Sequence, residues 1–239
     1  MADFRAGGAT GSLPAVQAGD GGSNPTPALQ FGPKDLIVRA IPHSIAAQVA
    51  RDRHYLRSAP ASPLLSFGVF AGPGLDGVAI FTPGPLNGYR LLAGAERRDV
   101  IALARLWLSD DLPRLGESRV LAVLARLVHR ATSAKAILAY SDPAAGHTGG
   151  IYRAAGWLYL GQAGAQPLMR IGRGPPRHLR TVGSLLGTHS ARYLRSRGLE
   201  VEMIPTIPKL RYLKILDESW QSRLTVDPMP YPRIGGERP

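Results

Sequence analysis

The chain has 239 residues, of which 44% are hydrophobic and 19% charged, and it contains no cysteine. This length fits one domain with additions or two small domains, and the lack of cysteine excludes disulfides, thiol nucleophiles and Cys-ligated zinc. No apolar run approaches the ~20 residues that a membrane-spanning helix needs, and the first residues lack the pattern of a signal peptide. We therefore expect a soluble, cytoplasmic protein with no membrane partner.

Basic side chains outnumber acidic ones by 29 to 17, which gives a net charge of +12. Residues 170–239 alone hold 13 Lys and Arg against six Asp and Glu, a net of +7. Such an excess favours binding to phosphate backbones through counterion release. Nucleic acid is therefore an expected partner, although a merely solubilising surface would carry the same charge.

Composition divides the chain into three parts. Residues 1–30 are rich in Gly, Ala, Ser and Pro and are predicted to be a disordered tail, because they bury too little apolar surface to offset their ordering entropy. Residues 227–239 should form an irregular tail. The folded domain spans 31–226, which we divide into a core over 31–171 and a basic extension over 172–226.

Apolar periodicity predicts the elements of the first half. A short strand over 36–41 precedes a helix over 43–55 with Ser44 near its start as a cap. Strands over 67–70 and 77–81 form a probable hairpin around a Gly/Pro turn. The pattern over 99–108 fits either a strand or an amphipathic helix.

The second half continues with the clearest helix, over 117–130, which has one apolar face. The elements expected after it are a strand over 135–140, a helix over 149–155, strands over 157–160 and 168–171, a basic helix over 184–197, and a hairpin of 201–204 with 210–216. This mixture predicts an α+β fold with a mixed, mostly antiparallel sheet flanked by helices.

The most informative segment is 140–161, which reads YSDPAAGHTGGIYRAAGWLYLG. A strand ends in a polar Ser141-Asp142-Pro143 turn, His147 follows between glycines, and the next helix carries Tyr152. The part IYRAAGWLYLG is similar to the acyl-CoA-binding half of GNAT acyltransferases. That resemblance implies that Tyr152 is the general acid for the departing CoA thiolate, and a phenol is indeed a proton donor at neutral pH.

Together with Arg53-His54-Tyr55, Glu117-Ser118-Arg119 and Thr188-His189, this segment resembles the Mom family of bacteriophage DNA-modification proteins over roughly residues 35–225. The resemblance implies a GNAT-type fold and an acyltransferase-like enzyme that converts adenine in double-stranded phage DNA to N6-carbamoylmethyladenine, which protects the DNA from host restriction. It implies acetyl-CoA or a related CoA thioester as the donor. Plain acetyl transfer would not make a carbamoylmethyl group, so further cofactor chemistry is implied.

One departure from ordinary GNAT enzymes concerns their glycine-rich pyrophosphate loop, because the same place here has a single glycine, Gly116. Backbone N–H groups at a helix start still bind phosphates, helped by arginines. The residues expected to bind the cofactor are Arg114, Gly116, Ser118 and Arg119. Ser118 would serve equally well as a helix N-cap.

Six polar residues form the candidate catalytic set: His54, Tyr55, Ser141, Asp142, His147 and Tyr152. Asp142 and His54 are expected to position or activate the nucleophile or a metal. Imidazole, carboxylate and phenolate are the ligand types of a non-haem iron site, so His54, Tyr55, Asp142 and Tyr152 would suit iron if the fold brings 54–55 beside 142–152. Structural roles remain open: a helix end at 54–55, a turn cap at Asp142 and core packing of Tyr152.

Basic residues of the extension are the candidate DNA contacts: Arg177, Arg180, Arg192, Arg195 and Arg197. A solvated helix face would explain them as well. Because adenine N6 lies inside the base stack, a DNA-modifying enzyme has to flip the base or act on frayed DNA.

Two rival functions remain: an acyltransferase for another modified base or a small amine, and a non-catalytic DNA-binding protein on the same fold. The sequence also leaves the oligomeric state open, a homodimer included.

Overall fold

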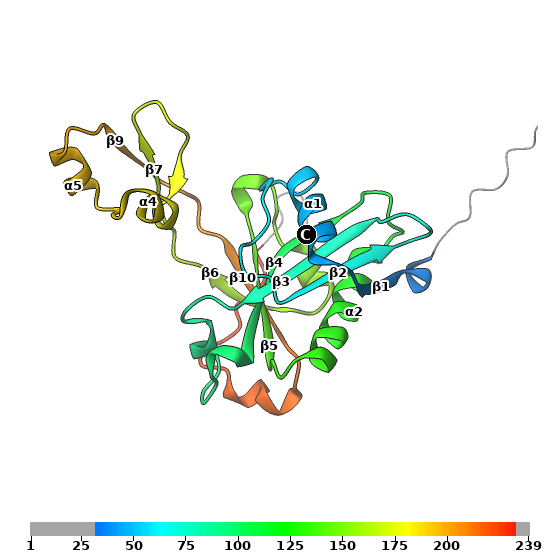
Figure 1. Ribbon diagram of the computed structural model, residues 1–239. Helices are drawn as coiled ribbons and strands as arrows, with labels where there is room; N and C mark the ends of the chain where they lie inside the picture. Colours follow the sequence, from blue (N-terminus) through cyan, green and yellow to red (C-terminus); the bar gives the residue numbers. More distant parts are fainter. Residues whose placement is uncertain (1–31, 233–239) are drawn as a thin grey trace, which may run out of the picture. The chain divides into compact units, whose positions relative to one another are not determined.

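Two β-sheets and their helices make up residues 32–232, which this computed structural model describes (Figure 1). The larger sheet has the strand order β1-β2-β3-β4-β5-β10-β6, and the smaller one has the order β8-β7-β9. The tail expected over 1–30 lies outside the described residues, as do residues 233–239. Residues 227–232 have no helix or strand, as predicted for that part of the carboxyl-terminal tail.

The strands are β1 (Ile37–Ala40), β2 (Leu65–Phe70), β3 (Gly77–Pro83), β4 (Val100–Leu108), β5 (Ala136–Ser141), β6 (Leu158–Gln162), β7 (Leu168–Ile171), β8 (Arg177–His178), β9 (Val201–Ile204) and β10 (Leu210–Ile215). The α-helices are α1 (His43–Asp52), α2 (Gly116–Ala131), α3 (Gly150–Ala154), α4 (Leu179–Leu186) and α5 (Ala191–Ser196). Short 3-10 turns include η1 (Pro33–Asp35) and η4 (Pro143–Ala145). None of these described helices is long and apolar enough to cross a bilayer.

Helices α1 and α2 cover opposite faces of the larger sheet. The apolar stripe of α2, with Leu121 at its centre, packs in one cluster with Phe81 of β3. Ala46 and Ala50 of α1 pack instead against Ile80. Neighbouring residues of a strand face opposite sides, so the sheet is buried on both faces at β3. Each fully buried large apolar side chain here stabilises the fold by about 1.5–3 kcal/mol.

The sheet is mixed and mostly antiparallel, which confirms the predicted α+β class. The predicted hairpin is formed by β2 and β3. The segment over 99–108, whose pattern fitted either a strand or an amphipathic helix, is the strand β4. β4 pairs antiparallel with β3 and parallel with β5, and α2 makes the connection between the two parallel strands.

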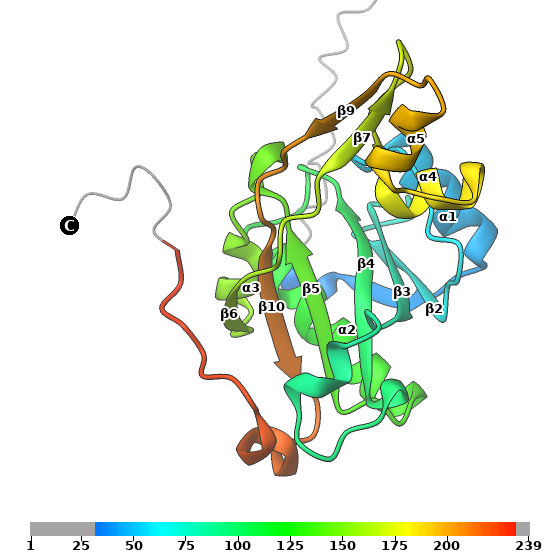
Figure 2. The same ribbon diagram turned by 90° about the vertical axis from the view of Figure 1, so that its left-hand side faces the viewer.

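β4 and β5 separate halfway along their length (Figure 2). Their pairing runs from Val100 only to Leu103, after which β4 pairs with β3 alone and β5 pairs with β10 alone. At the same level the β3–β4 register shifts, because Ile80 opposes Arg105 whereas Phe81 opposes Leu103. The extra residue, Ala104, is a β-bulge, and bulges bend a strand away from its course. The separated ends of β4 and β5 create room for a cleft.

The predicted hairpin of 201–204 with 210–216 is wrong. β9 pairs with β7 in the smaller sheet, whereas β10 enters the larger sheet between β5 and β6. Leu210, Tyr212 and Leu213 of β10 are buried, and such a strand needs a neighbour on each side. The expected boundary at residue 171 therefore does not follow the sheets, because residues 168–204 form the extension while β10 belongs to the core.

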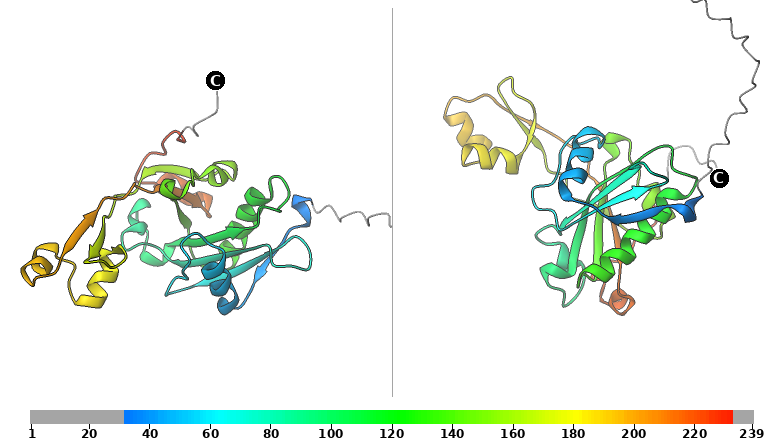
Figure 3. Two further views of the ribbon diagram at one scale, coloured as in Figure 1. Left: turned by 90° about the horizontal axis from the view of Figure 1, so that it is seen from above. Right: turned by 45° about the vertical axis from the view of Figure 1, so that its right-hand side comes forward.

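The predicted basic helix over 184–197 is two helices, α4 and α5, which pack on one face of the smaller sheet around Met169, Val182 and Leu194 (Figure 3). Gly187 ends α4 with a φ of 71°, in the left-handed region that favours glycine. Ser190 then caps α5 by accepting a hydrogen bond from the Tyr193 N–H at 3.3 Å.

Candidate active site

A cleft of about 1630 Å³ opens where β4 and β5 separate. Its walls come from the end of α1, the second half of β4, the end of β5 and the loop that follows β5. All six predicted catalytic residues line it, although they come from two segments that are distant in sequence. The cleft therefore joins residues 54–55 to residues 141–152.

His54 and Tyr55 lie just beyond α1, which ends at Asp52 and not at residue 55 as predicted. Ser44 does not cap this helix either, because the N-cap position is taken by Pro42. The His54 ring stacks on the Tyr55 ring with centroids 4.5 Å apart, and the Tyr55 ring lies 4.9 Å from that of His147. His54 is 6% exposed and Tyr55 41% exposed, so the tyrosine is the member of this stack that faces solvent.

Asp142 has two direct partners at the end of β5. Its Oδ1 accepts the Ala144 N–H at 3.1 Å, which makes it the cap of η4. Its Oδ2 lies 3.1 Å from Nζ of Lys209. Burial above all, and then the negative charge of Asp142, raise the pKa of Tyr55. Asp142 is thus the turn cap that was considered, and it also lines the cleft.

His54 is neutral at physiological pH. Burial lowers its pKa to about 4, and the positive charges of Arg105, His147 and Lys209 act in the same direction. Its Nδ1 accepts the Leu56 N–H at 3.1 Å, which assigns the proton of the neutral ring to Nε2. The imidazole can therefore donate a hydrogen bond from Nε2, and it is a poor general base.

Tyr152 lies deeper than Tyr55. Its ring is 5.0 Å from the Tyr212 ring and 5.1 Å from that of Trp157, and the residue is 6% exposed. Burial raises the pKa of Tyr152, so its hydroxyl stays protonated across the physiological range. Tyr152 thus packs in the core, as considered, and also lines the cleft. Its role as a general acid stays a prediction.

The loop that carries His147 is shaped by two glycines and by Tyr212. Gly146 and Gly149 have φ values of 79° and 80°. The Tyr212 hydroxyl donates to the Thr148 carbonyl at 2.9 Å. Ser141 is buried beside this tyrosine, and its Oγ has no hydrogen-bond partner among the described residues.

Among the cationic residues that line the cleft, the sequence reasoning missed Arg105 and Lys209. Arg105 follows the bulge in β4, and its guanidinium donates to the Ser58 carbonyl at 2.8 Å. An arginine inside the apolar run VIALARLWL was a signal that could have found it. Lys209 lies in the segment between β9 and β10, and no local pattern marks it, because its place depends on where β10 pairs.

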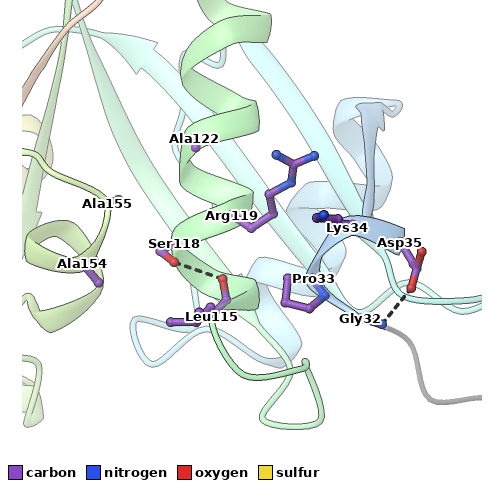
Figure 4. A pocket seen from close by; sticks show the side chains of 10 residues that line it. All are labelled: Gly32, Pro33, Lys34, Asp35, Leu115, Ser118, Arg119, Ala122, Ala154 and Ala155. Carbon is purple, nitrogen blue, oxygen red and sulfur yellow. Dashed lines mark hydrogen bonds between the residues drawn. The ribbon is translucent and has the colours of Figure 1, made fainter.

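The start of α2 borders a second cavity of about 730 Å³ (Figure 4). Lys34 of η1 and Ser118 and Arg119 of α2 line it, and Arg119 extends toward the segment that carries Lys34. The N-cap is Leu115, with a φ of 66°, and not Ser118, whose hydroxyl donates to the Leu115 carbonyl at 3.0 Å. The Nε of Arg119 is buried without a hydrogen-bond partner among the described residues.

The other two residues expected at a cofactor lie differently. Gly116 is buried, and an added Cβ would come within 3.3 Å of Leu112 and Leu36, so this glycine allows close packing. Arg114 is exposed and lines neither of the two cavities.

Within residues 32–232, no group of three or more His, Cys, Asp or Glu side chains is close enough to hold a metal ion. Of the four residues that would suit iron, Asp142 is paired with Lys209, and burial raises the pKa of both Tyr55 and Tyr152 away from the phenolate form. The described side chains thus form no preassembled iron site.

The predicted DNA contacts divide into two kinds. Arg177, Arg180, Arg192 and Arg197 are exposed around α4 and α5, and Arg180 also lines the cleft. The guanidinium of Arg195 instead donates to the Val201 carbonyl at 2.8 and 3.3 Å, which ties α5 to β9.

The family model described as the Mom protein family matches residues 35–233 of this chain. A methylcarbamoylase from Escherichia phage Mu is 26% identical over 210 residues, which cover 85% of this chain and 86% of that protein.

Solved structures with a similar fold include a chain from Salmonella typhimurium that holds the cofactor acetyl-CoA, with 9% identity, coverage of 77% of this chain and 95% of that one, and a TM-score of 0.43. The ribosomal-protein-S5-alanine acetyltransferase of Vibrio fischeri has 14% identity, coverage of 78% and 95%, and a TM-score of 0.42.

The family match and the phage Mu relative, which spans most of both chains, indicate a transferase-type enzyme. This chain belongs to the Mom protein family.

Proposed function

We propose that this enzyme modifies DNA at the exocyclic amine of adenine and that its product is N6-carbamoylmethyladenine. The observation that carries the proposal is the meeting of Tyr55 and Asp142 in one cleft, where the charge of Asp142 acts on the phenol. The similar protein of phage Mu bears the name methylcarbamoylase. A polar cluster in a large cavity is the usual form of a catalytic site.

The adenine amine is a poor nucleophile, because its lone pair is delocalised into the ring. It must lose a proton as the new bond to carbon forms. Tyr55 can take that proton on its hydroxyl oxygen while its own proton passes to Asp142, the charged acceptor that lines the same cleft. The Nε2–H of His54 can donate to an oxygen on which negative charge develops. Tyr152, protonated and buried at the cleft wall, is the proposed proton donor to the leaving group.

A CoA thioester would supply an activated acyl group in the cleft, and amine attack on it would release the thiolate and form an N6-acyl adenine. The carbamoylmethyl product contains an N–CH2 bond and an amide nitrogen instead, so a further cofactor would have to supply the chemistry that acyl transfer does not provide. The residues that fit its diphosphate border the second cavity, where Lys34 and Arg119 bring positive charge to the start of α2. The unpartnered Nε of Arg119 is a donor that a phosphate oxygen would satisfy.

The extension would hold the DNA backbone. Arg177, Arg180, Arg192 and Arg197 are exposed there, and Arg180 also reaches the cleft, so it is placed to hold the strand near a flipped base. Arg195 is left out of this set, because its guanidinium is bound to the backbone of its own chain. The double-stranded DNA partner and the modified base rest on this distribution of charge and on family membership.

Nucleoside mass spectrometry tests the proposal. DNA from bacteria that express the chain should contain a nucleoside heavier than deoxyadenosine by one carbamoylmethyl group. Asp142→Asn should remove that nucleoside, since it removes the charged acceptor, and an equal amount of folded protein on a thermal melt is the control. An unmodified adenine pool would refute the activity, and a modified base other than adenine would refute the substrate. DNA binding without any modification would favour a non-catalytic protein.

A further inference from the structure

Among the described residues, Lys209 is the only cation that forms an ion pair with a candidate catalytic residue of the cleft. Its Nζ lies 3.1 Å from Oδ2 of Asp142. The side chain of Asp142 is 15% exposed and that of Lys209 is 37% exposed, so the pair is partly shielded from water. Salt screens such a pair less than a fully exposed one.

The carboxylate of Asp142 is otherwise incompletely fixed. The Ala144 N–H holds Oδ1 and the Lys209 ammonium group holds Oδ2, while the charge of this carboxylate acts on Tyr55. Without the ammonium group, Oδ2 would lose its charged partner and the carboxylate could turn about its side-chain bond. The Tyr55 hydroxyl, on which the charge of this carboxylate acts, would then lose a defined acceptor for its proton.

We propose that Lys209 is a positioning residue: it fixes the Asp142 carboxylate and, through it, the Tyr55 hydroxyl that faces the substrate. This role rests on the proposed function, in which Tyr55 and Asp142 handle the proton of the amine. A displacement of about 1 Å in a reacting group can lower a rate by about 100-fold, so a side chain that touches neither substrate nor donor can still control turnover.

The place of Lys209 in the chain gives this role a second consequence. Residues 205–209 lead from β9 of the extension back to β10 of the larger sheet, and the Lys209 carbonyl accepts the Ala163 N–H of the outgoing segment at 2.7 Å. Lys209 thus lies where both connections of the extension meet the core. In the proposed function, DNA held by the extension would therefore act on the segment that orients Asp142.

A partly exposed lysine in a basic protein could instead contact a DNA phosphate, and kinetics separate the two roles. Lys209→Met keeps the aliphatic stem and removes the charge. We expect kcat to fall by about 10–100-fold, while KM for DNA and the salt dependence of DNA affinity stay as in the wild type. Lys209→Arg should restore most of kcat, since a guanidinium can also pair with a carboxylate. Lys214→Met, in the adjacent strand β10 and outside the cleft, is the matched control and should leave kcat unchanged.

A double-mutant cycle tests the contact without any catalysis. The melting temperatures of Lys209→Met, Asp142→Asn and the double variant are compared, and the combined loss should be smaller than the two single losses together, because either change alone breaks the same pair. Additive losses would overturn the positioning role, whatever the activity of the wild type. A retained kcat in Lys209→Met with a raised KM and a shallower salt dependence would also overturn it. A wild-type protein that leaves adenine unmodified would refute the proposed function alone, and the cycle would still decide whether Lys209 holds Asp142.

Discussion

Two glycines in the loop before α3 allow backbone strain to be separated from a steric clash. Gly146 and Gly149 both have φ values near 80°, at 79° and 80°. A Cβ added at Gly146 would meet nothing within 4 Å, whereas one added at Gly149 would overlap the hydroxyl end of Tyr212. Tyr212 cannot easily move away, because the residue is 1% exposed and its ring packs against Tyr152 and Tyr159.

The expected magnitudes differ accordingly. Gly146→Ala should cost about 1 kcal/mol, since the left-handed region costs about 1–2 kcal/mol for a residue with a Cβ and the less flexible unfolded chain returns about 0.4–1 kcal/mol. Gly149→Ala adds about 1–3 kcal/mol of overpacking. For a chain of this size about 2–4 °C of melting temperature corresponds to 1 kcal/mol. The melting temperature should therefore fall by about 2–4 °C for Gly146→Ala and by about 4–16 °C for Gly149→Ala.

Thermal unfolding followed by circular dichroism measures both variants at one pH and salt concentration. Gly146→Ala is the matched control, because it lies in the same loop and has the same backbone conformation. Equal losses in the two variants would mean that Tyr212 does not pack against this loop, and the reasoning about how His147 is held would then fail.

Three further predictions concern charge and chemistry. The pKa of His54 falls from 6.5 to about 4 on folding, so the unfolded chain binds more protons between these values. The free energy of unfolding, measured by denaturant titration, should therefore drop by about 3 kcal/mol as pH is lowered from 6.5 to 4. A His54→Gln variant whose free energy of unfolding changes with pH as steeply as that of the wild type would contradict this. Tyr55→Phe should lower kcat for adenine modification by about 10²–10⁴-fold. Its melting temperature should change little, because the ring keeps its stacking partners. Tyr152→Phe should lower kcat as well, and full activity of both variants would show that neither phenol takes part in the mechanism. Arg180→Ala should reduce the slope of log affinity for DNA against log salt concentration by about 0.9. Arg195→Ala should instead lower the melting temperature, because it removes the hydrogen bonds to the Val201 carbonyl. The reverse pattern would show that the two arginines were assigned wrongly.

Local sequence was enough for most individual elements. The apolar stripe of α2 and the alternation in β2 and β3 produce the same elements in the structure, because periodicity reflects burial on one face or on both. The segment 140–161 also located half of the site, since its strand, polar turn and helix are continuous in sequence. Errors of local origin were small: Gly187 divides a predicted helix, and Leu115 stands where Ser118 was expected as a cap.

What local sequence could not decide is the pairing of distant segments. β9 and β10 look like one hairpin, yet burial of β10 on both sides places it between β5 and β6. That placement carries Lys209 to Asp142, just as the bulge at Ala104 turns Arg105 toward the cleft. Residue types and elements follow from the order of amino acids along the chain, whereas the assembled cleft depends on contacts between segments far apart in sequence, which form only when the whole sheet is buried.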